Sequence, residues 1–316
     1  KGKEIYPYVV PREFLKKKQI KKLPLAPLPN TRYVSCNEFG SWKKIKTDKL
    51  GFNNKVFLRS FDILLMGDSF AEGSCVDQVN EPANIFKKNF DKTAYNIGVS
   101  GNGPLLSLAL AHEIKDILDF KYLIWFIYDN DFYDVKLELK SSFLVKYINK
   151  DFKGNDYFSN TDEINFFQKK YIKKNIEKFK IGYSLKENLL ELKPLIYKIN
   201  VLIAKIKFKS NDNKIQNILK KIFHKLYFLY PEKRIFIVYL PETSCFQNRI
   251  NECKQRFLDL KNSSKNLVFL NFYEHIKKKK INYKKMYAFG QNKSHFSPEG
   301  YMTLIRFINK EVNFNN

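Results

Sequence analysis

Apolar residues in this chain gather in short runs, and stretches with helical spacing lie between them. Residues 61–66 form an apolar run that stops abruptly at Gly67, which is typical of a strand buried on both faces. Similar runs predict strands at 94–99, 122–128, 234–240 and 266–272. Helical spacing follows Pro104, and Ser297 with Pro298 predicts the start of a last helix that ends near Val312. This alternation of strands and helices predicts βαβ units.

The fold class predicted from this order is α/β, a three-layer sandwich with a central parallel sheet. Residues 1–60 contain five prolines, which favour extended backbone over helix. We therefore expect an irregular N-terminal arm over 1–60, packed on a domain that spans 61–316. Lys-rich segments with helical spacing predict a helical insertion in that domain at about 137–230.

Composition narrows the class of protein. The chain has 316 residues, of which 44% are hydrophobic, so it can bury a core. Its net charge is +25, but only seven of its 57 basic residues are arginine. Sequence-specific nucleic-acid readers use arginine for bidentate contacts, so we expect no specific nucleic-acid partner and attribute the lysines to codon bias. No apolar stretch reaches the roughly 20 residues of a transmembrane helix.

The four cysteines lack the spacing of a zinc or redox motif. A bridge between Cys36 and Cys75 would fasten the arm to the domain and close a loop of about 40 residues, worth on the order of 4 kcal/mol. Cys245 and Cys253 would close a smaller loop. The alternative is four reduced thiols in a cytosolic protein.

Candidate chemistry follows the predicted strands, where ligands bind in open α/β sheets. Asp68 and Ser69 follow the first strand, and a glycine-rich loop that contains Gly101 follows the second. Asn130 follows the third, and His295 precedes the last helix. Taken singly, each has a structural explanation as a turn, a tight packing site or a helix start. Their common position at strand ends predicts one converging site.

In combination these residues resemble the SGNH/GDSL hydrolase family. The matching segments are GDSF at 67–70, NIGVSG at 96–101, YDND at 128–131 and HFSPEGY at 295–301. CNEFG at 36–40 and TDKLGFNN at 47–54 resemble the lead-in of bacterial envelope members. The resemblance implies a flavodoxin-like fold and covers about 30–135 and 285–312. The Lys-rich middle has no counterpart in it.

The resemblance also implies the residue roles. Ser69 is the nucleophile and His295 the general base, with Ser69 Oγ within or slightly beyond hydrogen-bond reach of Nε2. The backbone N–H groups of Ser69 and Gly101 and the amide of Asn130 form the oxyanion hole, supported by Asp68 and Asp131. The family has an aspartate three residues before the histidine, and this chain has Asn292 there. The catalytic group is then a Ser–His dyad or a degenerate triad.

The implied function is hydrolysis of ester bonds, most consistently of O-acetyl or O-acyl groups on carbohydrates. Two alternatives remain open, a polysaccharide O-acyltransferase and a non-catalytic glycan-binding module, the second because of Asn292. No metal or organic cofactor is expected. We expect a small-molecule or polysaccharide ester as substrate, and a periplasmic or extracytoplasmic location with an anchor outside this sequence, rather than a cytoplasmic one. The sequence does not indicate an oligomeric state.

Overall fold

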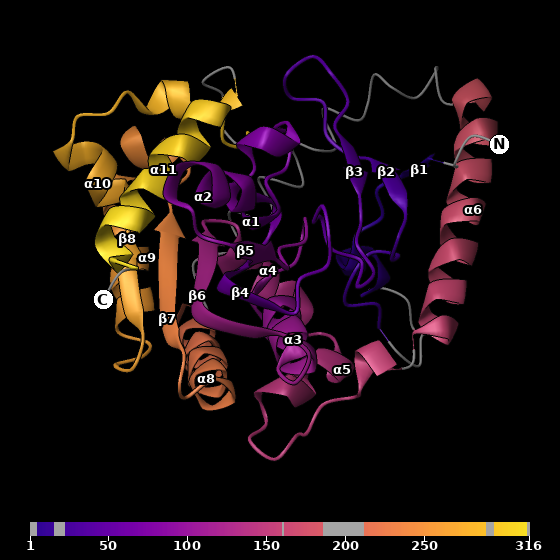
Figure 1. Cartoon of the computed structure of the whole chain (residues 1–316), viewed down its shortest axis with the longest axis horizontal. Coiled ribbons are helices and arrows are strands. Elements are labelled where there is room, and N and C mark those ends of the chain that lie inside the picture. Colours follow the sequence, from indigo (N-terminus) through magenta and orange to yellow (C-terminus); the bar gives the residue numbers. More distant parts are fainter. Residues whose placement is uncertain (1–4, 16–22, 160, 186–211, 289–293, 315–316) are drawn as a thin grey trace.

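The computed structural model describes residues 5–15, 23–159, 161–185, 212–288 and 294–314. At its centre is a five-stranded sheet in which every pair of neighbours is parallel (Figure 1). Its strands are β4 (Ser60–Met66), β5 (Ala94–Asn96), β6 (Asp119–Tyr128), β7 (Arg234–Leu240) and β8 (Val268–Asn271). The predicted α/β fold with a central parallel sheet is confirmed.

The spatial order of the strands is β5-β4-β6-β7-β8. In chain order this is 2-1-3-4-5, the flavodoxin-like arrangement of a doubly wound sheet. The chain leaves β4 toward one side of the sheet and later continues on the other side from β6. In such sheets ligands bind at the switch point, beyond the carboxyl ends of these two strands. The topology therefore places the residues after β4 and β6 next to each other.

Alternate residues of the buried strands face two separate cores. Leu64, Met66 and Trp125 belong to one core, whereas Ile63, Leu65 and Phe126 belong to the other. Side chains of successive strand residues point to opposite faces, so apolar residues at both positions require cover on both faces. This explains why the strands read as unbroken apolar runs in the sequence.

Helices cover both faces of the sheet and form the outer layers of the sandwich (Figure 1). Buried side chains of α3 (Pro104–Ile114), α8 (Asp212–Leu229) and α9 (Ile250–Lys261) join the first core. Those of α2 (Pro82–Phe90), α10 (Phe272–Lys278) and α11 (Pro298–Val312) join the second. The helix predicted from Ser297 and Pro298 is present, and the Ser297 side chain accepts a hydrogen bond from the Gly300 N–H at its start.

The N-terminal arm is not wholly irregular, which corrects part of the expectation for 1–60. It contains a three-stranded sheet of β1 (Ile5–Pro7), β2 (Arg32–Val34) and β3 (Lys44–Lys46). Each strand has three residues, too short to produce a clear alternation in the sequence. The proline-rich segment 23–28 between β1 and β2 is buried without helix or strand, as its prolines require.

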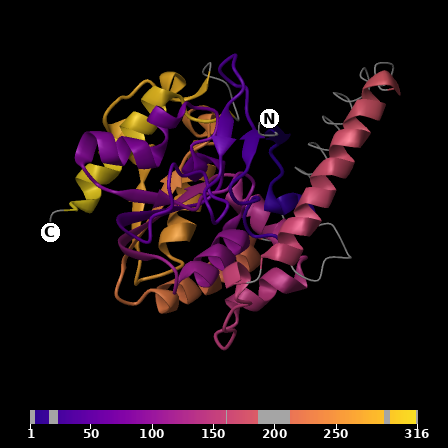
Figure 2. The ribbon, with the colours of Figure 1, turned by 45° about the vertical axis from the view of Figure 1, so that its right-hand side comes forward.

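Within the described residues, the insertion contains helices and a segment without helix, 149–156. It contains the last part of α4 (Asp131–Glu138), then α5 (Ser142–Val145), α6 (Asp162–Leu185) and α8. Residues 186–211 lie outside the described residues. In both views α6 runs beside the arm (Figures 1 and 2), and its Gln168 side chain donates to the Ala26 carbonyl at 2.9 Å. Among the described residues, no helix combines the length and apolarity needed to cross a membrane.

Candidate active site

Ser69 lies at the switch point of the sheet, three residues beyond Met66 at the end of β4. It is the first residue of the short helix α1 (Ser69–Glu72), where the Asp68 carboxylate caps the turn by accepting from the Phe70 N–H at 2.9 Å. As the first helical residue, Ser69 has a backbone N–H without a carbonyl partner inside the helix. Its side chain is partly exposed, whereas Asp68 and Phe70 are buried. The turn therefore leaves Ser69 partly accessible, with a backbone N–H that no helical carbonyl occupies.

Gly101 follows β5 on a loop beside this turn. Its φ of +77° lies in the left-handed region, which glycine adopts without the penalty of a side chain. A Cβ at this position would lie 3.5 Å from side-chain atoms of Val10 and Arg12. The arm thus lies on the loop that carries Gly101.

Asn130 follows β6 and begins α4, on the other side of β4. Its Nδ2 donates to Asp134 Oδ2 at 3.0 Å, and its Oδ1 is buried without a hydrogen-bond partner. Asp134 in turn forms an ion pair of 2.8 Å with Arg12 of the arm. Asp131 accepts from the Tyr128 N–H at 2.8 Å and so fixes the end of β6. In this structure the Asn130 amide is therefore directed at Asp134.

His295 approaches the same turn from the segment before α11. Its ring centroid is 5.3 Å from that of Phe70, the neighbour of Ser69. Within the described residues, no hydrogen bond joins Ser69 to His295. Hydrogen bonds in active sites without substrate are often long and tighten in the complex. The structure brings the two blocks together in space, and the direct contact remains a prediction.

Glu38 is the carboxylate that contacts His295, and the sequence analysis did not identify it as a site residue. Its Oε1 is 2.8 Å from His295 Nδ1, and its Oε2 accepts from the His295 backbone N–H at 2.8 Å. Asn292 lies outside the described residues. The only signal available in the sequence was the position of Glu38 in CNEFG, part of the lead-in that resembles the hydrolase family. A separation of 257 residues conceals such a contact.

Burial and charge set the protonation of the carboxyl groups around the turn. Burial raises the pKa of Asp68 to about 6, although the Phe70 N–H, the charge of His295 and the Asn130 amide oppose the shift. For Glu38 burial also acts to raise the pKa, but the hydrogen bonds and charge of His295 outweigh it, and the pKa is lowered from 4.5. Glu38 is therefore ionised at neutral pH, as an acceptor for the Nδ1 proton requires.

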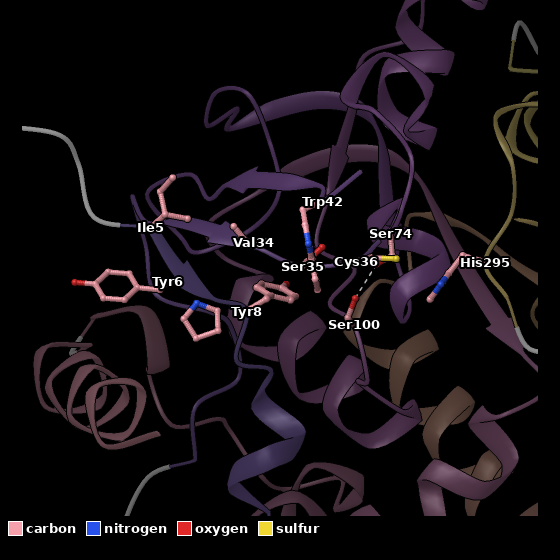
Figure 3. Close-up of a pocket in the computed structure, with 11 residues that line it drawn as sticks. Ile5, Tyr6, Tyr8, Val34, Ser35, Cys36, Trp42, Ser74, Ser100 and His295 are labelled. Atoms are coloured by element: carbon pink, nitrogen blue, oxygen red, sulfur yellow. Dashed lines mark hydrogen bonds between the residues drawn. The ribbon is translucent and has the colours of Figure 1, made fainter. Parts of the chain in front are cut away.

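A pocket of about 550 Å³ opens beside His295 (Figure 3). Its aromatic lining comes from Tyr6, Tyr8 and Trp42 of the arm, and Trp42 is 61% exposed. Its polar lining includes Ser74 and Ser100, whose hydroxyls lie 2.8 Å apart.

Those two hydroxyls rest on a buried carboxylate. Glu72, at the end of α1, accepts hydrogen bonds from Tyr8, Ser74 and Ser100. Glu72 thereby links α1, the helix that begins with Ser69, to the pocket and to the arm. The pocket therefore has an aromatic wall and a hydroxyl-lined floor.

Two disulfides are present, Cys36–Cys75 with a Cα–Cα distance of 5.0 Å and Cys245–Cys253 with 5.7 Å. Each pair lies in a group that resembles a metal-ligand set, the first with Glu38 and His295. A cysteine binds a metal ion as a thiolate, which a disulfide sulfur is not. In the oxidised protein neither group therefore offers the thiolates that such a site requires.

No family model matches this chain, and no curated protein matches it. Solved structures of similar fold include a catalytic mutant of the acetylxylan esterase Axe2 from Geobacillus stearothermophilus. It is 13% identical, with 81% of this chain and 95% of that chain covered and a TM-score of 0.42. Another is a Clostridium thermocellum family 3 carbohydrate esterase, at 10% identity, 79% and 94% coverage and a TM-score of 0.39. The functional assignment therefore rests on the geometry of the site.

Proposed function

We propose that this protein is a serine esterase that hydrolyses O-acetyl or other O-acyl groups of carbohydrates. The observation that carries the proposal is the position of Ser69 at the switch point of the sheet, with His295 packed against the same turn. Glu38 occupies Nδ1 of the imidazole, so Nε2 is the nitrogen that remains to accept the serine proton. This assigns the base by its hydrogen bonds.

In the proposed reaction Ser69 Oγ forms a bond to the ester carbonyl carbon, and its proton moves to Nε2 of His295. The negative charge on the carbonyl oxygen is met by the N–H groups of Ser69 and Gly101 and by the Asn130 amide, which must turn from Asp134 to reach it. The ester C–O bond then breaks, and His295 returns the proton to the leaving sugar alcohol. Water, activated by the same base, releases the acyl group and regenerates Ser69.

The pocket beside His295 supports a carbohydrate as the alcohol part of the ester. Indole and phenol rings offer flat apolar faces with a polar edge, which suit the C–H faces of a sugar ring. The hydroxyls of Ser74 and Ser100 can exchange hydrogen bonds with sugar hydroxyls. An exposed tryptophan at the mouth of a polar-floored pocket is costly to leave in water, and stacking on a sugar removes that cost.

The alternatives predict different outcomes for the acyl group. An O-acyltransferase would pass it to a second sugar hydroxyl rather than to water. A non-catalytic module was suggested by Asn292, because that residue cannot supply a carboxylate. The carboxylate of Glu38 on His295 supports catalysis instead.

Two disulfides favour an extracytoplasmic location.

Labelling with a fluorophosphonate probe tests the nucleophile, because the probe reacts with an activated serine. We expect stoichiometric labelling of the wild type and none of Ser69→Ala, together with a loss of at least 10³-fold in hydrolysis of a small acetyl ester. Ser159→Ala, at an exposed serine away from the turn, serves as control and should behave as the wild type. Labelling of Ser69→Ala at the wild-type rate would contradict the proposal.

Comparison of two substrates tests the carbohydrate. Trp42→Ala should lower kcat/KM for an acetylated oligosaccharide by about ten-fold, the loss of one aromatic stacking contact, and leave a small acetyl ester unaffected. Phe166→Ala, at a 71% exposed aromatic residue on α6, is the matched control. An equal loss of kcat/KM for both substrates would contradict the proposal that the pocket binds the sugar. Release of free acetate distinguishes hydrolysis from transfer to added sugar.

A further inference from the structure

We propose that Glu38, delivered by the N-terminal arm, is the positioning carboxylate of His295, and that two anchors of the arm hold it there. The inference rests on the proposed function, since it assigns how that same site is assembled. It replaces the acid expected at Asn292 by a residue from the other end of the chain.

The contact has the geometry that a positioning carboxylate needs. One oxygen lies 2.8 Å from Nδ1, and the other accepts from the backbone N–H of the same residue. The first contact fixes the tautomer with its proton on Nδ1, and the second fixes the carboxylate relative to the histidine backbone. A group held at both oxygens cannot rotate away from the ring. The imidazole is thereby oriented with Nε2 free for Ser69.

Glu38 sits on a short loop, residues 36–43, that is tied at both ends. At one end Cys36 is bonded to Cys75, whose Sγ lies 3.1 Å from His295 Nδ1. At the other end the buried Lys43 forms an ion pair of 2.7 Å with Glu81 and donates to the Gly73 carbonyl at 2.6 Å.

The two ends are also paired to each other through the backbone. The Lys43 N–H donates to the Cys36 carbonyl at 2.8 Å. Both anchors reach the segment directly after the nucleophile helix, because Gly73 and Cys75 follow α1. The loop is therefore fixed to the same piece of chain that carries Ser69, which keeps Glu38 in register with the nucleophile.

Asp68, from the turn between β4 and α1, is a second carboxylate that interacts electrostatically with His295. Its carboxylate, however, caps the Phe70 N–H. Phe70 covers one side of the ring. Glu38 is thus the carboxylate that contacts the imidazole, and its second oxygen binds the backbone of the same histidine.

The first test replaces the charge and keeps the shape. Glu38→Gln should lower kcat for a small acetyl ester by about 10²- to 10⁴-fold with KM within about three-fold, as expected when a histidine loses its carboxylate partner. Glu38→Asp should recover part of the lost kcat. Glu299→Gln, at an exposed residue of α11, is the control and should keep the wild-type kcat. A Glu38→Gln enzyme within two-fold of wild-type kcat would overturn the inference.

A spectroscopic readout covers the case in which the variant is poorly active for other reasons. An imidazole N–H bonded to a carboxylate gives a low-field proton resonance in NMR spectra. We expect this signal in the wild type and in Asn292→Asp, and its loss in folded Glu38→Gln. Persistence of the signal in Glu38→Gln would overturn the inference without any measurement of activity.

The second test addresses the anchors and the expected acid. Cys36→Ala combined with Cys75→Ala should lower kcat at least ten-fold and weaken the low-field signal, because one end of the loop is released. Asn292→Asp should leave kcat within two-fold of the wild type, because His295 Nδ1 is already bonded to Glu38. A gain of ten-fold or more would show that Glu38 does not position the imidazole.

The two proposals fail separately. If the fluorophosphonate probe labels Ser69→Ala, Ser69 is not the nucleophile and the esterase proposal fails. If Ser69→Ala is unlabelled and inactive while Glu38→Gln matches the wild type, the esterase proposal stands and the role of Glu38 alone is wrong.

Discussion

Single carboxyl groups beside the Ser69 turn contribute to how the stability of this protein depends on pH. Asp68 is buried and has a pKa raised to about 6, and burial likewise raises the pKa of Asp134 to about 6 against the opposing charge of Arg12. Both groups hold their proton longer in the folded than in the unfolded state. Between the unfolded-state pKa and the folded-state pKa of each carboxyl group, the folded protein therefore binds more protons than the unfolded chain. Its stability falls as pH rises through that window.

Asp68→Asn tests this at one residue. Asp68 shifts from its ordinary value of 3.8 to about 6, which corresponds to a destabilisation of up to about 3 kcal/mol that develops as pH rises from about 4 to above 6. Asparagine keeps an acceptor for the Phe70 N–H but does not titrate. We expect the free energy of unfolding in urea to decline less over this range in Asp68→Asn. Asp116→Asn, at an exposed position, should retain the wild-type slope, and an equal slope in Asp68→Asn would refute the assignment.

At the scale of elements, close packing of α1 on the loop after β5 sets the position of Ser69, the proposed nucleophile. Gly98 allows this approach, because a Cβ there would lie 2.6 Å from Ala71 Cβ and 2.7 Å from the Glu72 nitrogen. The Asn96 side chain reinforces it by donating to the Ala71 carbonyl at 2.5 Å. The helix that begins with Ser69 and the loop that leads to Gly101 therefore form one unit.

Gly98→Ala should separate these two elements. Backbone atoms of α1 cannot yield to a contact of 2.7 Å without a shift, so we expect a loss of about 1 to 3 kcal/mol in unfolding free energy. Because the shift moves Ser69 relative to Gly101, kcat for a small ester should fall more than ten-fold even in the folded fraction. Ser159→Ala, at an exposed serine away from these two elements, is a control and should keep the wild-type stability and kcat. Wild-type kcat in Gly98→Ala would show that the approach is not needed.

At the scale of the whole molecule, the arm and the sheet domain together form the candidate site. The arm supplies Glu38 to the histidine, Trp42 to the pocket and Arg12 to Asp134. The disulfide between Cys36 and Cys75 spans 39 residues and joins the two parts, whereas that between Cys245 and Cys253 spans eight within the domain.

Loss of these disulfides should affect stability unequally. In the chain-entropy model the longer loop contributes about 4 kcal/mol and the shorter one about 2.5 kcal/mol. Cys36→Ala with Cys75→Ala should therefore lower Tm more than Cys245→Ala with Cys253→Ala, as measured by calorimetry at one pH. The reverse order would mean that the arm is held mainly by its packing and by the ion pair of Lys43 with Glu81.

The sequence by itself determined the sheet and the placement of most candidate residues. Strands buried on both faces need apolar residues at every position, and this local property is legible without any tertiary contact. The run at 234–240 coincides with β7 (Arg234–Leu240). Parallel strands end at a common edge, so residues after β4 and β6 could be assigned to one region before any distance was known.

Only the tertiary structure decided which side chains contact each other there. Glu38 and His295 meet across 257 residues, and no periodicity encodes a pair at that separation. The same holds for the arm, whose three-residue strands become strands by pairing with one another and not by local propensity. The orientation of the Asn130 amide toward Asp134, and the pocket that the arm completes beside His295, also follow from packing of distant segments. Local sequence fixes where backbone elements form, whereas hydrogen bonds between distant side chains exist only once those elements have packed.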